Sequence, residues 1–435
     1  SLLCPFINCE PAGEMTLPDF GPMFSVRSYL KQAAPPFVKK AVDKLRGGLN
    51  GPGVEATALR PYGFHPDPNP QPRLSLVLPS LSARGAYGGV TTGLDLAFAL
   101  AEAADVPLRV VAEQPIDPND NVLDRYPRAE IHALAASNFQ LPVRRGDVFL
   151  LFNWWISLNI EQVLEDQARH FDLDKRPKIA LIQEYEPHFY PFSAAHLLAL
   201  EAFNGDMPIW GVFNSTELHE YYMAQGNRCD RAYVFEPRLS AALRPFMRGI
   251  DAAEKRRILL VYGRPNIPRN AFFLVQRGLE IWAARHGGNH AGWRFLSAGA
   301  DHAPLRLGSG VSLEPLGKLS LEDYGNLLRK TGIGLSLMSS PHPSYPPLEM
   351  AHFGARVISN RYANKRLERR LANIVSLPAC RPEVLADTLE AEIRAFEARP
   401  GDAVRGVSHM PDYLSDSPVE IIEPLARDIR NLMKG

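Results

Sequence analysis

The chain has 435 residues, a length that predicts two or three domains. Lys plus Arg and Asp plus Glu number 48 each, so the formal net charge is zero, which excludes a nucleic-acid-binding protein that depends on a basic field over its whole surface. The sequence has no apolar run of about 18 residues, so no transmembrane helix is predicted. The chain has four cysteines, which are too few and too scattered to indicate a disulfide framework or a zinc site: Cys4, Cys9, Cys229 and Cys380. We therefore expect a reducing, cytoplasmic setting.

The first 72 residues are predicted to be an N-terminal extension that ends in a Pro-rich linker. The run 61–72 (PYGFHPDPNPQP) is too rich in proline to form a helix or a central strand. Six basic residues lie between positions 27 and 46, and Asp43 is the acidic residue among them. Two interpretations of the stretch 27–46 stay open: it is a solvated helix face, or it makes a peripheral contact with the anionic inner face of a membrane.

From residue 73 the pattern changes to short apolar strands that alternate with helices. The predicted strands of this first half, residues 73–237, are 73–79, 107–113, 147–153, 177–183 and 208–214. Helices are predicted from about residue 93 and over 159–170, 193–203 and 215–225. The alternation favours a parallel sheet that is covered by helices on both faces.

A second series of the same kind occupies residues 238–414. Its predicted strands are 256–263, 293–299, 311–317, 332–338 and 355–359. Its predicted helices are 270–286, 320–330, 346–354 and 381–397. The terminal residues 415–435, with a helix over 419–434, are predicted to cross back onto the first half, so the chain is expected to be an α/β protein of two similar halves.

Ligands of open parallel sheets bind beyond the carboxyl ends of the strands, and a Gly-rich loop follows the first predicted strand at such an end. Gly88 and Gly89 in this loop allow the backbone to approach a ligand closely, and the next helix offers free N–H groups. The spacing is not the GxGxxG fingerprint of dinucleotide-binding proteins, which disfavours a nicotinamide-dependent oxidoreductase. The alternative interpretation of the loop is a tight turn.

Two further loops carry charged residues. In the segment 263–270, Arg264 and Arg269 follow a strand and can clamp a diphosphate, or they are surface arginines that bond loop carbonyls. In the segment 339–350, small and proline residues lead into a helix with Glu349 expected in its first turn. The positive helix end should keep this carboxylate ionised and able to accept bonds from sugar hydroxyls, unless it serves only the helix dipole.

Together, these loops resemble those of GT-B glycosyltransferases of the retaining family 4, and the similarity covers residues 73–435. The stretch 183–191 (QEYEPHFYP), with Asn153-Trp154-Trp155 and Asn214-Ser215, resembles the bacterial rhamnosyltransferases of the WsaF type. The resemblance implies a GT-B fold, in which two Rossmann-like domains face a central cleft. It also implies the retaining transfer of L-rhamnose from dTDP-L-rhamnose onto a bacterial surface polysaccharide such as O-antigen, with a glycan or lipid-linked glycan as the acceptor.

The resemblance also implies roles for individual residues. Arg264 would neutralise the leaving diphosphate with help from Arg269 or Lys318, and Glu349 would hold the ribose or the donor sugar. The implied donor-binding residues are Gly263, Arg264, Arg269, Gly317, Lys318, Leu319, Ser344, Tyr345, Leu348 and Glu349. The implied acceptor-side residues are Gly88, Gly89, Tyr185, Glu186 and Asn214, and the implied catalytic residues are Arg264, Glu349 and Glu186. No metal ion and no cofactor other than the donor are expected.

One position departs from the family pattern. A first glutamate is expected eight residues before Glu349, where this sequence has Pro341. Sugar contacts must then come from the backbone of 339–342 or from Ser344 and Tyr345. The departure keeps open a non-catalytic glycan- or nucleotide-binding module, and a GDP- or UDP-sugar donor also stays open. His65, His188 and His342 lack metal-ligand spacing and are expected to make loop hydrogen bonds.

Overall fold

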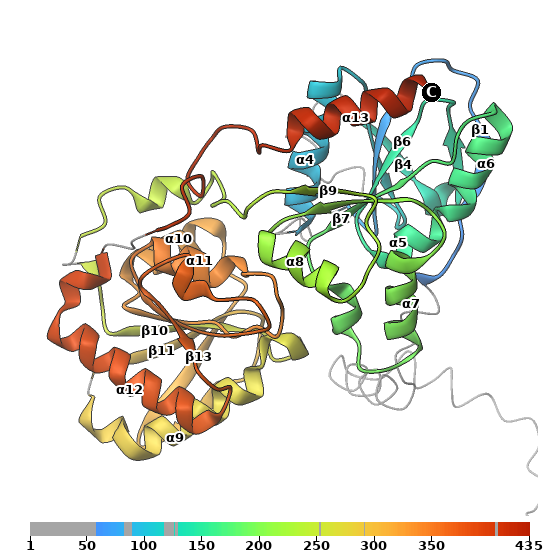
Figure 1. The fold of residues 1–435 in the computed structure, drawn as a ribbon. Coiled ribbons are helices and arrows are strands. Elements are labelled where there is room, and N and C mark those ends of the chain that lie inside the picture. The colour runs from blue at the N-terminus through green and yellow to red at the C-terminus, as the bar shows by residue number, and fades with distance from the viewer. Residues whose placement is uncertain are drawn as a thin grey trace, which may run out of the picture. The chain divides into compact units, whose positions relative to one another are not determined.

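The computed structural model describes residues 58–81, 89–116, 126, 129–251, 254–290, 292–404 and 408–435. The basic stretch 27–46 and Gly88, both named above, lie outside the described residues. Two α/β halves follow one another in the chain from residue 59, and each is built on its own sheet (Figure 1).

The first half is built on a parallel sheet. Within the described residues this sheet has seven strands in the order β4-β3-β2-β6-β7-β8-β9. The strands are β2 (Leu74–Leu78), β3 (Leu108–Ala112), β4 (Glu130–Ala133), β6 (Val148–Leu151), β7 (Lys178–Ile182), β8 (Ile209–Phe213) and β9 (Arg231–Val234). Strands β2, β3, β6, β7 and β8 are buried over their whole length, which explains why their sequences are mostly apolar. The polar residues in them, Ser75, Arg109 and Lys178, are buried as well.

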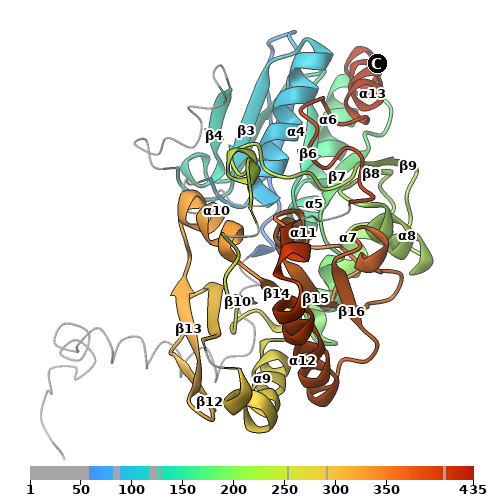
Figure 2. The same cartoon turned by 90° about the vertical axis from the view of Figure 1, so that its left-hand side faces the viewer.

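Helices cover both faces of this sheet. They are α4 (Gly89–Ala104), α5 (Trp154–Asn159), α6 (Glu161–Phe171), α7 (Ala194–Asn204) and α8 (Thr216–Ala224). Successive residues of β2 point to opposite faces, so Leu76 packs in the cluster with α4 while Val77 packs in the cluster with α5 and α6. The C-terminal helix α13 (Ile422–Lys434) crosses back and lies beside α4 (Figures 1 and 2), and Arg176 donates a hydrogen bond to the carbonyl of Leu432.

The second half has a sheet of the same kind. Among the described residues its seven strands run in the order β12-β13-β11-β10-β14-β15-β16, and all neighbouring pairs except β12 and β13 are parallel. The strands are β10 (Ile258–Gly263), β11 (Arg294–Gly299), β12 (Leu305–Gly308), β13 (Val311–Gly317), β14 (Ile333–Leu335), β15 (Arg356–Asn360) and β16 (Ile374–Leu377).

Two pairs of helices cover the faces of the second sheet (Figure 2). The helices are α9 (Phe272–His286), α10 (Leu321–Lys330), α11 (Tyr345–His352) and α12 (Pro382–Ala398). Leu279 of α9 and Leu389 of α12 share one apolar cluster, whereas Leu328 of α10 and Leu348 of α11 share another. The expected α/β fold of two Rossmann-like halves, with a C-terminal helix that returns to the first, is confirmed.

Short elements complete the chain. The 3₁₀ helices are η2 (Leu134–Ser137), η3 (Glu186–Phe189), η4 (Arg244–Met247), η6 (Pro268–Asn270), η7 (Gly287–Asn289), η8 (Leu367–Arg369) and η9 (Pro400–Val404). In the part of the chain that the structure describes, no helix has the length and apolar character needed to cross a membrane.

The predicted Pro-rich linker is partly structured. Residues Gly63–Pro66 form strand β1, which pairs in parallel with β5 (Gln140–Val143) in a separate two-stranded sheet. The linker prediction was wrong for this stretch because proline is tolerated at the end of an edge strand. Tyr62 anchors it, since its hydroxyl donates to Glu113 Oε1 at 2.7 Å and its ring is buried in the core of the first half.

Candidate functional site

The loop after β10 presents two arginines. Gly263 ends the strand, and Arg264 follows it with its Nη1 3.4 Å from the Tyr262 hydroxyl. No carboxylate lies within 4.0 Å of Arg264 in the described part of the chain. Arg269 lies in η6, where its guanidinium stacks 4.4 Å from the Phe189 ring centroid. The loop therefore holds one arginine that has no acidic partner among the described residues and a second that is fixed by packing on Phe189.

Gly263 has a structural reason to be glycine. A Cβ at this position would overlap the Oγ of Ser297 on the neighbouring strand β11, and that hydroxyl is 2.7 Å from Nε2 of His302. We expect Gly263→Ala to lower the free energy of unfolding by about 1–3 kcal/mol, as overpacking of a core does. Urea denaturation measures this loss. Gly288→Ala, where a Cβ meets nothing within 4 Å, is the control, and equal stability of the two variants would contradict the explanation.

The loop 339–344 lies against the arginine loop. The backbone N–H of Ser339 donates to the carbonyl of Arg269 at 2.7 Å, and Ser344 adopts a φ of 70°, which is uncommon for a residue other than glycine. Helix α11 then begins at Tyr345 with proline in its first turn. A loop with such a backbone and a direct bond to the arginine loop is held in one conformation.

Glu349 differs from expectation in two ways. It lies in the second turn of α11 rather than in the first, because the helix begins at Tyr345. Burial raises its pKa to about 7, while the hydroxyl of Tyr324 donates to Oε2 at 2.8 Å. The expected place in the first turn was wrong, and burial opposes the ionised state that the helix end was expected to favour.

The remaining donor-side residues fall into two groups. Gly317 ends β13 with a φ of 64°, and Lys318 is exposed beyond it. Leu319 and Leu348 pack in the apolar cluster under α10 and α11, so these leucines face the core of the second half. The two leucine side chains therefore do not face a ligand.

The stretch 183–191 follows β7 in the first half. Tyr185 is 3% exposed, and its hydroxyl accepts a bond from Asn227 Nδ2 at 3.1 Å within a cluster of aromatic rings. Glu186 accepts a bond from the backbone N–H of Trp154, the first residue of α5, at 2.6 Å. Burial, and then the charge of Glu184, raise the pKa of Glu186 to about 8.

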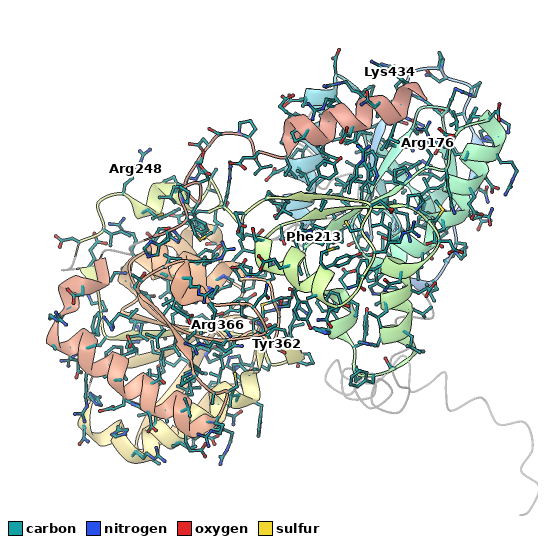
Figure 3. All side chains as sticks on the ribbon, viewed as in Figure 1. Arg176, Phe213, Arg248, Tyr362, Arg366 and Lys434 are labelled. Carbon is teal, nitrogen blue, oxygen red and sulfur yellow. The ribbon has the colours of Figure 1, made fainter. Side chains whose placement is uncertain are left out.

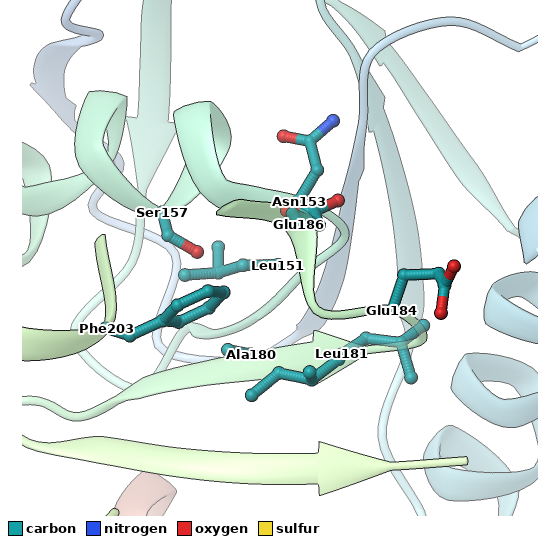
Figure 4. Close-up of a pocket in the computed structure, with 9 residues that line it drawn as sticks. Leu151, Asn153, Ser157, Ala180, Leu181, Glu184, Glu186 and Phe203 are labelled. Atoms are coloured by element: carbon teal, nitrogen blue, oxygen red, sulfur yellow. The ribbon is translucent and has the colours of Figure 1, made fainter. Parts of the chain in front are cut away.

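A small cavity lies beside these residues (Figure 4). It has about the room of one water molecule. Its lining residues are Leu151, Asn153, Ser157, Ala180, Leu181, Ile182, Glu184, Glu186 and Phe203. The cavity is too small for a sugar, so Glu186 meets a pocket of the first half that does not hold a substrate.

The N-terminus of α4 and the end of β8 also reach the second half. Gly89 begins α4 and accepts a bond from Gln183 Nε2 at 3.0 Å through its carbonyl. The hydroxyls of Thr92 and Tyr345 are 3.5 Å apart and join the two halves. Asn214, directly after β8, is 1% exposed, and its Oδ1 has no hydrogen-bond partner among the described residues.

Further bonds join the halves away from the arginine loop. Arg370 donates from Nε to Glu217 Oε1 at 2.7 Å, and its Nη2 lies 2.7 Å from Glu236 Oε2. The hydroxyl of Tyr362, labelled in Figure 3, is 3.1 Å from Nδ1 of His188. These contacts join loops at the carboxyl ends of both sheets, where ligands of parallel sheets bind.

Two polar side chains near these loops, Glu184 and Lys365, were not among the predicted site residues. Glu184 accepts a bond from the hydroxyl of Ser340 in the other half. Lys365 donates to the carbonyl of Met338 at 2.8 Å, and burial lowers its pKa to about 8. The position of Glu184, within the stretch 183–191 and directly after a strand, was a usable signal, whereas nothing in the sequence marked Lys365.

The sequence leaves two roles open for His342, a metal ligand or a residue that makes loop hydrogen bonds, and its contacts support the second. Its Nδ1 accepts the backbone N–H of Ser344 at 3.0 Å, and burial lowers its pKa to about 3. The neutral ring therefore carries its proton on Nε2, which is buried and has no partner among the described residues. Within the same described residues, no three His, Cys, Asp or Glu side chains lie close enough together to hold a metal ion.

Solved structures share this arrangement of two sheets. Sucrose-phosphate synthase from Thermosynechococcus elongatus has a TM-score of 0.52 at 14% identity and covers 84% of this chain and 94% of its own. The N-terminal domain of trehalose-6-phosphate phosphatase from Candida albicans has a TM-score of 0.51 at 9% identity and covers 83% of this chain and 96% of its own. At these identities the likeness shows the fold alone, which is the GT-B fold of glycosyltransferases.

The sequence comparisons give the family. The model "WsaF, N-terminal domain" matches residues 73–216, and the model "WsaF, C-terminal domain" matches residues 257–390. The chain belongs to the WsaF family, and its fold is the GT-B fold. A curated relative, the O-antigen biosynthesis protein RfbC of Myxococcus xanthus, is 32% identical over 179 residues. That match covers 41% of this chain and 13% of the much longer relative.

Proposed function

We propose that this chain is a retaining rhamnosyltransferase that moves L-rhamnose from dTDP-L-rhamnose onto a bacterial surface polysaccharide such as O-antigen. The observation that carries the proposal is Arg264 at the carboxyl end of β10, with no carboxylate within 4.0 Å among the described residues. A guanidinium that has no carboxylate partner and lies at the carboxyl end of a parallel sheet, where ligands bind, suits the diphosphate of a nucleotide sugar. Membership of the WsaF family and the O-antigen relative support the sugar and the acceptor class.

The donor is held from two sides in this proposal. Arg264, assisted by Arg269 or Lys318, binds the diphosphate, while Glu349 accepts hydrogen bonds from hydroxyls of the ribose or the sugar. The backbone around Gly317 meets the base. A trehalose-6-phosphate protein of E. coli, with a TM-score of 0.50 at 9% identity over 83% of this chain and 97% of its own, is described as bound with UDP-2-fluoro glucose, which supports a nucleotide sugar in this fold.

The transfer itself needs no nucleophile from the protein. The bond between the sugar C1 and the diphosphate oxygen breaks, and the acceptor oxygen forms the new bond to C1 on the same face. The acceptor proton moves to the departing diphosphate oxygen. Arg264 stabilises the charge that develops on the diphosphate, which is where electrostatic catalysis acts.

The first half receives the acceptor in this proposal. Gly89 and Asn214 lie at the carboxyl ends of its strands, where Asn214 Oδ1 lacks a partner among the described residues and can accept a bond from an acceptor hydroxyl. Glu186 contributes through the orientation of α5, whose first N–H it accepts. A lipid-linked acceptor would bring the chain to the inner face of the membrane, where the basic stretch 27–46 would meet anionic lipid.

Pro341 favours a second candidate function. Without a carboxylate at this position, the chain can be a non-catalytic module that binds a glycan or a nucleotide. Hydrolysis of the donor in the absence of an acceptor separates the two functions, because a binding module releases no free sugar.

We expect dTDP to raise the melting temperature more than UDP or GDP does. A ligand at 100 times its dissociation constant stabilises the folded state by about 2.7 kcal/mol, which corresponds to several degrees in a chain of this size. A thermal-shift series with the three diphosphates at equal concentration measures the difference. A preference for GDP or UDP would overturn the dTDP-rhamnose assignment while leaving the transferase intact.

A further inference from the structure

Glu184 belongs to the first half, yet its carboxylate bonds with the second. It follows β7 by two residues, and its Oε1 accepts a bond from the hydroxyl of Ser340. Its Oε2 lies 3.6 Å from Nε of Arg269. In Figure 4 the carboxylate points away from Phe203 and from the apolar part of the cavity. Glu184 is therefore the acidic side chain that the first half extends between the arginine loop and the loop 339–344.

Glu184 and Arg269 are too far apart to form a direct hydrogen bond with each other. A charge-assisted bond between a guanidinium and a carboxylate spans about 2.7–2.9 Å, whereas here the two atoms are 3.6 Å apart. Nε of Arg269 is buried and has no hydrogen-bond partner among the described residues. Burial raises the pKa of Glu184 to about 7, and the charge of Arg269 favours its ionised form. That form has about four acceptor sites, and the Ser340 hydroxyl occupies one of them. A free donor and a free acceptor thus lie side by side, and both side chains keep some access, at 26% and 14% exposure for Arg269 and Glu184.

A hydroxyl group satisfies both atoms at once, because it donates one hydrogen bond and accepts others. A phosphate oxygen does not, since it cannot donate to the carboxylate and is repelled by its charge. The neighbouring position adds a second argument. Ser340, the partner of Glu184, directly precedes Pro341, the position at which the family pattern predicts a glutamate.

We propose that Glu184 and Arg269 together bind one hydroxyl of the donor sugar, so that the first half supplies the carboxylate that position 341 lacks. The inference rests on the proposed function, because it needs a nucleotide sugar in the site. Glu184 accepts the hydrogen of the hydroxyl, and Nε of Arg269 donates to its oxygen. The remaining N–H groups of Arg269 stay available to the diphosphate. The pair thereby contributes affinity for the sugar and none for the nucleotide alone.

The test compares two ligands by calorimetry on the full chain: dTDP, and dTDP-L-rhamnose in the absence of acceptor. In Glu184→Gln we expect the affinity for dTDP to change less than about 3-fold and the affinity for the nucleotide sugar to fall about 10- to 100-fold, the effect of losing one charged hydrogen bond. Glu113→Gln is the matched control, because Glu113 is a buried carboxylate of the same half whose bonds go to Tyr62, Trp155 and Asn159. It should leave the ratio of the two affinities unchanged.

Ser340→Ala provides a second variant in case Glu184→Gln does not fold. It removes the hydroxyl that orients Glu184 and should lower the affinity for the nucleotide sugar about 3- to 10-fold, again without an effect on dTDP. An equal loss for both ligands in Glu184→Gln, or no loss for either, overturns the inference. A wild-type chain that binds neither ligand overturns the proposed donor itself, so the two failures are distinguishable.

Discussion

Arg264→Ala should lower the rate of sugar transfer about 10²- to 10³-fold while the fold stays intact. The loss is the usual cost of removing one donor that stabilises charge in the transition state. The fold should survive because Arg264 is partly exposed and its polar contact is a long one, 3.4 Å to the Tyr262 hydroxyl. Steady-state kinetics with saturating acceptor, together with a melting curve, measure both quantities.

Two controls make this result specific. Arg264→Lys keeps the charge but loses the planar fork, so we expect activity between that of Arg264→Ala and the wild type. Arg277→Ala removes an arginine from the surface of α9, where it pairs with Glu280, and should retain full activity. Turnover close to normal in a folded Arg264→Ala protein would show that the leaving diphosphate is stabilised elsewhere.

The elements that sequence alone predicts well are those with a single dominant signal. Strands β2, β3, β6, β7 and β8 are buried on both faces, so each is a short and mostly apolar run between loops, which is typical of a strand inside a parallel sheet. The outer strands β4 and β9 are short and partly exposed, and their mixed sequences carry no such pattern. Helix α5 has six residues, fewer than the two turns that a helical period needs to show itself.

For the candidate site, sequence predicts which stretch of the chain is involved but not the direction in which each side chain points. The stretch 183–191 marked Glu186 as a candidate, but pattern alone does not tell that its neighbour Glu184 is the carboxylate that meets the second half. If Glu184 and Glu186 lay two residues apart on a strand, their side chains would point to the same face of the sheet. The chain leaves β7 at Ile182 and enters η3 at Glu186, so the two carboxylates diverge, one toward Ser340 and the other toward the N-terminus of α5. Tertiary contacts between halves decide such directions, and the local sequence does not encode them.

The raised pKa of Glu349 also results from tertiary packing that the local sequence does not encode. Its helix position suggested stabilisation of the charge, whereas burial under α10 and the loop 339–344 dominates and raises the pKa. An enzyme that binds a sugar through this residue in its ionised form must therefore remove a proton from it near neutral pH. Donor binding supplies the compensation, because hydroxyl groups that donate to the carboxylate favour the charged form.

Glu349→Gln should lower the transfer rate about 10- to 100-fold, because neutral hydrogen bonds to the donor replace charge-assisted ones. The stability of the variant should depend on pH in a defined way. The folded-state pKa of about 7 lies above the ordinary value of 4.5, so the folded chain holds a proton that the unfolded chain releases. The resulting stabilisation is present below about pH 4.5 and is lost as the pH rises through 7. Glutamine has no such proton, and its Oε1 can still accept the bond from Tyr324.

Melting temperatures of wild type and Glu349→Gln should therefore coincide at about pH 4, and the variant should melt a few degrees higher at pH 8.5. Glu280→Gln, in α9, where Glu280 is partly buried and pairs with Arg277, is the control and should show neither the loss of activity nor the pH-dependent gain. A Glu349→Gln chain that melts lower than the wild type at both pH values yet transfers sugar at the normal rate would make Glu349 a structural residue. The donor would then have to be held by the arginine loop together with Glu184, and the proposed position of the sugar would move toward the first half.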